Sequence, residues 1–158
     1  MIDRRALLAG GSAAVAAALL LGRSSDAAAA RFAVTKSDAD WRRQLGPQRY
    51  RILRQSGTER PFSSPLDKER RRGRYLCAGC ANPLFSSATK FDSGTGWPSF
   101  YRALPKAVVT RGPRSAFFGT EILCARCGGH LGHVFNDGPK PTGLRYCMNG
   151  LALRFQPA

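Results

Sequence analysis

The sequence predicts a mainly β domain with short helices on its N-terminal side. From Tyr75 onward, short apolar segments alternate with Gly, Pro, Asn and Asp, a pattern typical of short strands joined by tight turns. The chain has 158 residues, which suits one ordinary domain. It contains neither of the glycine-rich motifs that bind nucleotide phosphates. We therefore expect a small antiparallel sheet or barrel.

Residues 1–30 have the layout of an export signal. Arg4 and Arg5 precede residues 6–21, which are uncharged and almost wholly apolar, and small residues follow as cleavage sites. The paired arginines resemble a twin-arginine signal, so we expect export to the periplasm. The apolar run is short and rich in Ala and Gly, which argues against a stable membrane span and leaves a weak anchor as the alternative. Cleavage would leave a single domain, residues 31–158.

The first part of that domain, residues 31–72, is expected to be helical and irregular. Ser37 has the character of a helix N-cap, because acidic residues that suit a first helical turn follow it. Gly46 and Pro47 are expected to end this helix and begin a second one, which Gly57 closes. Apolar residues at helical spacing provide the inward faces: Trp41, Leu45, Tyr50, Ile52 and Leu53.

The second part, residues 73–158, is expected to form the β core around a metal ion. Its short apolar segments, which we interpret as strands, are Leu84–Phe85, Lys90–Phe91, Ala107–Thr110, Phe117–Phe118, Glu121–Leu123, Val134–Phe135 and Arg145–Phe155.

Two identical C-x-x-C knuckles provide the strongest chemical signal. Cys77 and Cys80 form the first, and Cys124 and Cys127 form the second. Two such turns complete a tetrahedral shell of four thiolates, which suits one structural Zn²⁺ per chain with no open position for catalysis. Two alternatives stay open at this point: a pair of disulfides, and a local site in which His130 and His133 join the second knuckle.

The fifth cysteine, Cys147, has polar neighbours at a strand-like spacing. On a strand, residues two apart share a face, so Arg145, Cys147 and Asn149 would project together. A guanidinium favours the thiolate, which is the nucleophilic form, and an amide can hydrogen-bond a developing charge. A buried, inert cysteine is the alternative.

Two histidines and a tryptophan complete the candidate residues. His130 and His133 lie in a glycine-rich run and could act as acid or base near neutral pH. Trp97 lies on a predicted turn, where it is either part of the core or an apolar wall for a small ligand.

Several ordered motifs run from about Ser37 to Pro157: Trp41–Arg42, Gly57–Pro61 with Phe62–Ser64, Gly73–Cys80, Lys90–Gly94, Gly96–Phe100, Cys124–Gly128, His130–Phe135, Asp137–Pro139 and Arg145–Asn149. In sequence and in order they resemble the motifs of the B-type methionine sulfoxide reductases, which reduce the R epimer of peptide methionine sulfoxide. The resemblance implies two small antiparallel sheets that form a β-barrel-like core, with short helices packed outside.

The resemblance also implies a role for each candidate residue. Cys147 matches the family's nucleophile, and the four knuckle cysteines match its structural zinc ligands. The implied polar shell around the sulfoxide consists of His130, His133 and Asn149, with Arg145 nearby. Trp97 and Phe135 match the apolar wall that receives the substrate's methyl group.

The implied reaction is thiolate attack by Cys147 on the sulfoxide sulfur, while His130 or His133 supplies a proton to the oxygen. Methionine leaves, and Cys147 becomes a sulfenic acid that a reductant must restore. Many family members carry a resolving cysteine where this chain has Thr95. We therefore expect an external thiol reductant, thioredoxin-like or glutaredoxin-like, to act on Cys147 directly.

The charge of the chain suggests a different class of function. Its formal charge is +15, which suits an anionic partner but does not identify a reaction. The basic cluster Lys68–Arg74 has no aromatic residue interleaved with its charges, so we interpret it as a solvated loop. The alternative is a basic zinc-ribbon-like module that binds nucleic acid, but such a module gives Cys147 and the two histidines no role. We expect a monomeric enzyme that acts on oxidised proteins and does not bind nucleic acid.

Overall fold

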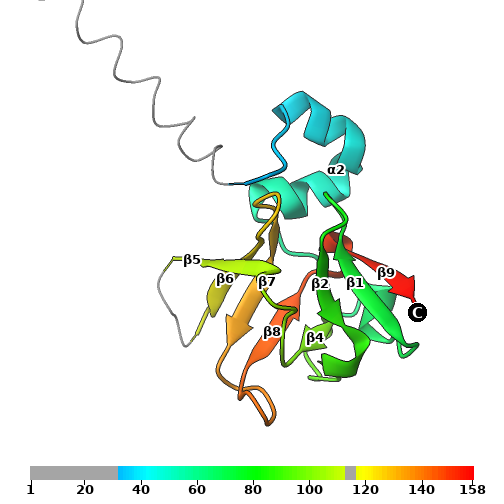
Figure 1. Cartoon of the computed structure of the whole chain (residues 1–158), viewed down its shortest axis with the longest axis vertical. Coiled ribbons are helices and arrows are strands. Elements are labelled where there is room, and N and C mark those ends of the chain that lie inside the picture. Colours follow the sequence, from blue (N-terminus) through cyan, green and yellow to red (C-terminus); the bar gives the residue numbers. More distant parts are fainter. Residues whose placement is uncertain (1–31, 113–116) are drawn as a thin grey trace, which may run out of the picture. The chain divides into compact units, whose positions relative to one another are not determined.

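A computed structural model describes residues 32–112 and 117–158. The predicted export signal, residues 1–30, lies outside these described residues. In the described part of the chain one α-helix, α2 (Asp38–Gln55), and one short 3-10 helix, η1 (Pro65–Asp67), precede the strands, and Figure 1 shows α2 at one end of the β structure. None of the helices in this part is long and apolar enough to cross a membrane.

Helix α2 consists of two helical pieces joined at a kink, as the sequence predicts. Gly46 breaks the helical geometry with φ 66° and ψ 171°, and Pro47 follows it. Ser37 is the N-cap, and its hydroxyl accepts a hydrogen bond from the Asp40 amide at 3.1 Å. The helix ends at Gln55, two residues before Gly57, because Ser56 takes the left-handed conformation. The buried residues are those predicted: Trp41, Leu45, Tyr50, Ile52 and Leu53.

The first of two antiparallel sheets has three strands in the order β2-β1-β9. Their bounds are β1 (Gly73–Cys77), β2 (Pro83–Ser86) and β9 (Leu153–Pro157). Tyr75 on the central strand pairs with Phe85 on one side and with Phe155 on the other. All three rings lie on the inner face of this sheet, where aromatic packing stabilises it.

The second sheet has six strands in the order β3-β4-β8-β7-β6-β5, with every neighbouring pair antiparallel. Their bounds are β3 (Lys90–Phe91), β4 (Ser99–Phe100), β5 (Val108–Arg111), β6 (Thr120–Cys124), β7 (His130–Phe135) and β8 (Arg145–Met148).

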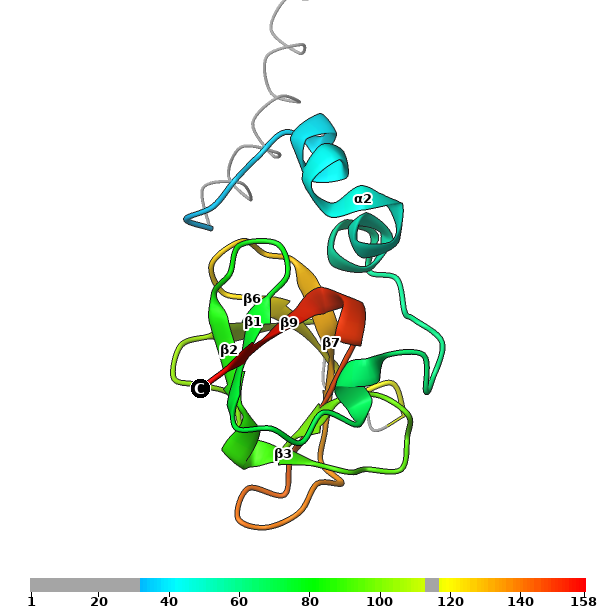
Figure 2. The same ribbon diagram turned by 90° about the vertical axis from the view of Figure 1, so that its right-hand side faces the viewer.

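Two small antiparallel sheets are therefore confirmed, but the core is not a closed barrel. The sheets curve around a common interior in Figure 2, yet the edge strands β3 and β5 are not hydrogen-bonded to each other. A barrel requires a continuous ladder of hydrogen bonds, and the two-residue strands β3 and β4 are too short to extend one.

The predicted strands are found with two exceptions. Phe117–Phe118 is an exposed turn, with the two side chains 91% and 80% exposed. The segment 145–155 is two strands, because a short 3-10 turn, η3 (Gly150–Ala152), separates them and sends β9 to the other sheet.

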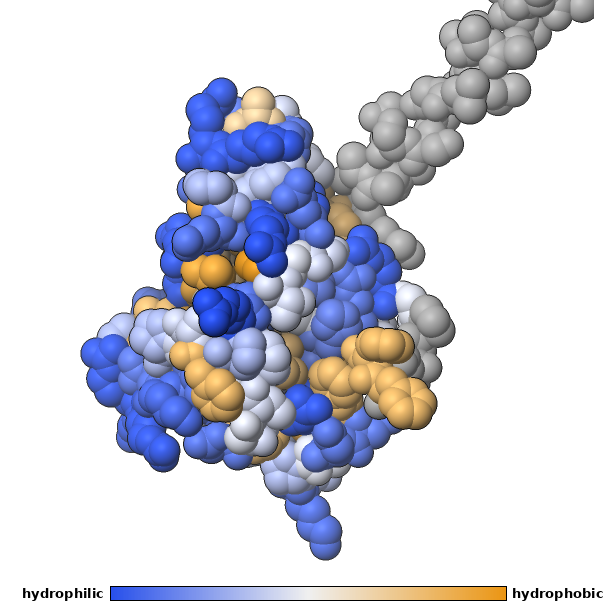
Figure 3. All heavy atoms as spheres, turned by 180° about the vertical axis from the view of Figure 1, so that it is seen from behind, coloured by the Kyte–Doolittle hydropathy of each residue, from blue (hydrophilic) through white to orange (hydrophobic). Residues whose placement is uncertain are grey.

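Aromatic rings fill the space between the two sheets. Phe85 of the small sheet stacks on Phe100 of the large sheet with ring centroids 4.4 Å apart. Tyr75 meets the same ring edge-on at 4.8 Å. These rings are fully buried, whereas the described surface in Figure 3 is largely hydrophilic, with only separate apolar patches. The core therefore fixes the strands that carry the candidate site.

Candidate functional site

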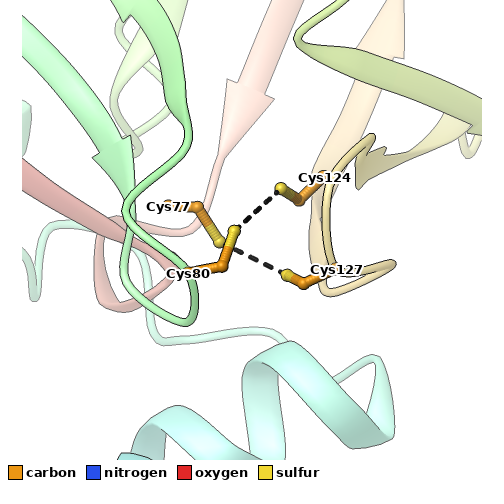
Figure 4. Close-up of side chains that lie close together, drawn as sticks. All are labelled: Cys77, Cys80, Cys124 and Cys127. Carbon is orange, nitrogen blue, oxygen red and sulfur yellow. Dashed lines mark hydrogen bonds between the residues drawn. The ribbon is translucent and has the colours of Figure 1, made fainter. Parts of the chain in front are cut away.

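The two knuckles converge on one point although they lie on different sheets. Cys77 and Cys80 come from the turn between β1 and β2, whereas Cys124 and Cys127 come from the turn between β6 and β7. Figure 4 shows the four thiols pointing toward one another. All four sulfur atoms lie within 4.8 Å of one another, with Cys77–Cys127 at 3.7 Å and Cys80–Cys124 at 3.5 Å.

These distances suit a four-coordinate metal ion. With metal–sulfur bonds of about 2.3 Å, the sulfurs of a tetrahedral zinc site are about 3.8 Å apart. The side-chain amide of Asn82 donates to Cys124 at 3.6 Å and to the Ala107 carbonyl at 3.1 Å, so it supports the cluster from outside. The cluster can therefore hold a metal ion that ties the two sheets together.

Both alternatives to a four-cysteine site disagree with the geometry. The sulfur separations are far longer than a disulfide bond of about 2.05 Å, and all five cysteines are free thiols. His130 turns its Nδ1 toward Glu121 rather than toward the second knuckle. Among the described residues, the four cysteines alone form a group of three or more potential metal ligands, so the local site with two histidines is wrong.

Cys147 lies in the middle of the large sheet, in a row of residues that crosses its strands. On β8 it stands opposite Ser99 of β4 on one side and opposite His133 of β7 on the other. His133 in turn stands opposite Glu121 of β6, and Glu121 stands opposite Arg111 of β5. Directly opposed residues share one face of a sheet, so this row places a thiol, an imidazole and charged groups side by side.

Hydroxyl groups surround the Cys147 thiol. Thr95 Oγ1 lies 3.8 Å from its sulfur, and Ser93 bridges Thr95 and Ser99 with two hydrogen bonds of 2.8 Å. Burial raises the pKa of the Cys147 thiol above its ordinary value, and hydrogen bonding from Thr95 and the charge of Arg145 offset this only in part. The hydroxyls therefore help to carry the thiolate charge that burial disfavours.

Arg145 lies on the Cys147 face, as the strand spacing predicts, and besides its interaction with the thiol its guanidinium has a second partner. It donates two hydrogen bonds of 2.8 Å to the carboxylate of Asp137. It also covers the ring of Phe135 at 4.2 Å from the centroid. Phe135 stands opposite Arg145 on β7, so the two side chains form one wall beside the thiol.

The two histidines lie together, with ring centroids 5.4 Å apart. Burial lowers the pKa of both imidazoles below the ordinary value, and it outweighs the opposing effect of Glu121 on His130. Both rings are therefore neutral at rest near pH 7, and a proton taken up there is readily given away.

Asn149 and Trp97 are both hydrogen-bonded to the backbone of the buried residue Glu59. The Asn149 amide accepts from the Glu59 backbone N–H at 2.9 Å and donates to the Leu131 carbonyl at 3.2 Å. The Trp97 indole donates to the Glu59 carbonyl at 3.2 Å. β8 ends at Met148, so Asn149 does not continue the strand face that Arg145 and Cys147 share.

Sequence reasoning missed Glu59, Ser99 and Glu121. The Glu59 carboxylate accepts hydrogen bonds from the backbone N–H groups of Gly150 and Leu151, the first at 2.5 Å and the second at 2.9 Å. Glu59 is 8% exposed, and acidic residues in the sequence are few. An acidic residue within a basic chain was the available signal, but no local pattern indicates a partner about 90 residues away.

Comparison with known proteins places this site in a described family. The family model for the SelR domain matches residues 45–157. The peptide methionine sulfoxide reductase MsrB of Leptospira interrogans is 56% identical over 127 residues, which cover 79% of this chain and 97% of that protein. The MsrB of Agrobacterium fabrum is 56% identical over 126 residues, 78% and 93% of the two chains. The MsrB of Methanosarcina barkeri is 51% identical over 129 residues, 80% and 91%.

Proposed function

This chain belongs to the SelR-domain family of peptide methionine sulfoxide reductases, and we propose that it reduces the R epimer of methionine sulfoxide with Cys147 as the nucleophile. It is an oxidoreductase that returns methionine sulfoxide in oxidised proteins to methionine. The position of Cys147 carries the proposal, because it stands between Ser99 and His133 on a face lined with proton donors.

The first step is attack by the Cys147 thiolate on the sulfoxide sulfur. The proton that the thiol gave up passes through His130 or His133 to the sulfoxide oxygen. The protonated oxygen then transfers from the substrate sulfur to the Cys147 sulfur, and methionine leaves as its bonds to that oxygen and to Cys147 break. Cys147 becomes a sulfenic acid, whose sulfur has lost the two electrons that the substrate gains. The wall of Phe135 and Arg145 lies beside this sulfur and limits how the substrate approaches.

An external thiol then restores the enzyme. The thiol attacks the sulfenic acid, which releases water and forms a mixed disulfide, and a second thiol frees Cys147. Thr95 supports this route, because it occupies the place beside Cys147 from which a neighbouring cysteine would act. The knuckle cysteines are engaged with one another across the sheets and are unsuited to this role.

The knuckles would hold one Zn²⁺, since four thiolates in a closed shell are the donors that structural zinc prefers. The ion would join the turns of the two sheets and leave catalysis to Cys147.

We also propose that residues 1–30 export the protein to the periplasm. Replacing Arg4 and Arg5 by Lys should then trap a full-length, zinc-loaded precursor in the cytoplasm, whereas undiminished export would argue for the general secretory route.

The activity is tested with dabsylated methionine R-sulfoxide and S-sulfoxide, each with dithiothreitol as the reductant. We expect only the R epimer to be consumed, and we expect Cys147→Ser to abolish its consumption while it keeps the metal and the fold. Equal use of both epimers would contradict the stereochemical proposal. Full activity of Cys147→Ser would show that another group is the nucleophile.

A further inference from the structure

A chain of charged contacts connects the edge of the large sheet to the buried histidine. Arg111 of β5 donates two hydrogen bonds to the carboxylate of Glu121 on β6, at 2.5 Å and 2.8 Å. The same carboxylate contacts Nδ1 of His130 on β7 at 2.7 Å. Ser56 at the end of α2 also donates to Glu121, at 3.2 Å. Glu121 thus has partners on three sides, and they orient it toward His130.

This contact determines which nitrogen of His130 carries the hydrogen. An ionised carboxylate only accepts hydrogen bonds, so Nδ1 must be the donor and Nε2 is left with a lone pair in the neutral ring. Although burial raises the pKa of Glu121, the hydrogen bonds from Arg111 and His130 hold it below its ordinary value. The carboxylate therefore remains ionised near neutral pH.

Nε2 of His130 is buried and has no hydrogen-bond partner among the described residues. The side chain as a whole is 2% exposed. Leaving a buried polar atom without a partner costs free energy, so a histidine with a purely structural role normally uses both nitrogens. The hydroxyl of Tyr75 is likewise unpartnered, but it lies in the aromatic core. His130 instead lies next to His133, which stands opposite Cys147.

We propose that Glu121, clamped by Arg111, is a positioning residue that keeps Nε2 of His130 free to exchange the proton that the sulfoxide oxygen takes up. This inference rests on the proposed reductase activity. When Nε2 carries that proton, the ring is an imidazolium, and the adjacent carboxylate compensates its charge in a buried place. Proton transfer would thus use a lone pair that the protein itself leaves unpartnered.

Only a few charged or titratable side chains among the described residues act on His130. The charged and titratable side chains that act on His130 are Glu121 of β6, Arg111 of β5 and His133 on its own strand. The end of α2 contributes the uncharged hydroxyl of Ser56 to the Glu121 carboxylate. Glu121 is thus the only anion among the described residues that contacts His130, which makes it the residue to change.

The experiment compares Glu121→Gln and Glu121→Ala with the matched control Glu69→Gln, which breaks a carboxylate–arginine pair whose arginine, Arg71, is exposed. Zinc content and circular dichroism establish that each variant is folded. We expect kcat on the R-sulfoxide to fall about tenfold in Glu121→Gln and about a hundredfold in Glu121→Ala, with little change in KM, because a positioned proton donor contributes on the order of 10²–10⁴. Glu69→Gln should match the unmodified protein.

A spectroscopic readout separates positioning from a merely structural effect. The chain has 2 histidines, so a His133→Asn background leaves only His130 in ¹H–¹⁵N spectra of the histidine ring. We expect hydrogen on Nδ1 when Glu121 is present and a shift toward the Nε2-protonated form in Glu121→Ala. An unchanged tautomer, or an unchanged kcat in a folded Glu121→Ala, would overturn the inference.

The two proposals fail in different ways. If the unmodified protein does not reduce the R-sulfoxide, the proposed activity fails, yet the tautomer of His130 still tests the role of Glu121. If the unmodified protein is active and both Glu121 variants match it, only the positioning role fails. Should Glu121→Ala lose its fold, the isosteric Glu121→Gln variant and its His130 spectrum decide the question.

Discussion

Replacing Glu59 tests how the fold positions its catalytic strand. The carboxylate accepts from the backbone N–H groups of Gly150 and Leu151, at the turn that directly follows the strand of Cys147. In Glu59→Ala these two donors lose their partners. A buried donor without a partner costs about 1–3 kcal/mol, and removing a desolvated carboxylate returns part of that cost. We therefore expect Glu59→Ala to lower the free energy of unfolding by about 2–4 kcal/mol.

The loss of stability should depend on the residue that replaces Glu59. Glu59→Gln keeps one acceptor oxygen, so it should cost about half as much as Glu59→Ala. Glu69→Ala is the control, because it removes a carboxylate whose ion-pair partner, Arg71, is exposed, so it should lower the free energy of unfolding far less than Glu59→Ala. Urea unfolding of the zinc-loaded proteins, monitored by circular dichroism, gives the free energy of unfolding of all three variants. If Glu59→Ala were as stable as Glu69→Ala, the reasoning that Glu59 anchors the turn after Cys147 would be refuted.

Three further predictions concern the metal and the nucleophile. Cys77→Ser should lose the bound zinc and much of the fold, whereas His133→Ala should keep both. Atomic emission measures the zinc content and circular dichroism measures the fold. Full zinc content in Cys77→Ser would contradict the four-cysteine site. Burial raises the pKa of Cys147 above its ordinary value, so the reactive thiolate forms mainly at alkaline pH. We therefore expect the rate at which iodoacetamide alkylates Cys147 to keep rising as the pH increases beyond 9.0. A rate that reaches its plateau below neutral pH would contradict the burial argument. Thr95→Cys should form an internal disulfide with Cys147 after one turnover, since Oγ1 of Thr95 lies 3.8 Å from the Cys147 sulfur; a free thiol count that stays constant would show that position 95 cannot reach it.

Local features of the chain were predictable from the sequence. The Ser37 cap, the break at Gly46 and Pro47 and the buried face of α2 follow from the spacing of neighbouring residues. The convergence of the knuckles follows from the chemistry of four thiolates. The strand that carries Cys147 was predicted too, because it lies in one of the short apolar segments that turn residues separate.

The features that sequence reasoning missed depend on partners far away in the chain. Glu121 lies in a segment that reads as an ordinary strand, and its contact with Arg111 arises only from the pairing of β5 with β6. Segment 145–155 breaks at Asn149–Gly150, a dipeptide typical of turns, but the binding of this turn by the carboxylate of Glu59 has no local signal. The closure of the sheets also depends on which edge strands meet, and no local pattern encodes that. Long-range polar contacts therefore limit what the sequence alone reveals about the site.

We propose that Cys147 takes the oxygen from the substrate and that no other cysteine in the chain then resolves it. The most direct test of this proposal is a single turnover of the zinc-loaded protein with the R-sulfoxide and no reductant, followed by dimedone labelling and peptide mass spectrometry. We expect about one methionine per chain, a dimedone adduct on the Cys147 peptide, and zinc still bound. An intramolecular disulfide formed with zinc retained, or an adduct on a cysteine other than Cys147, would contradict the account.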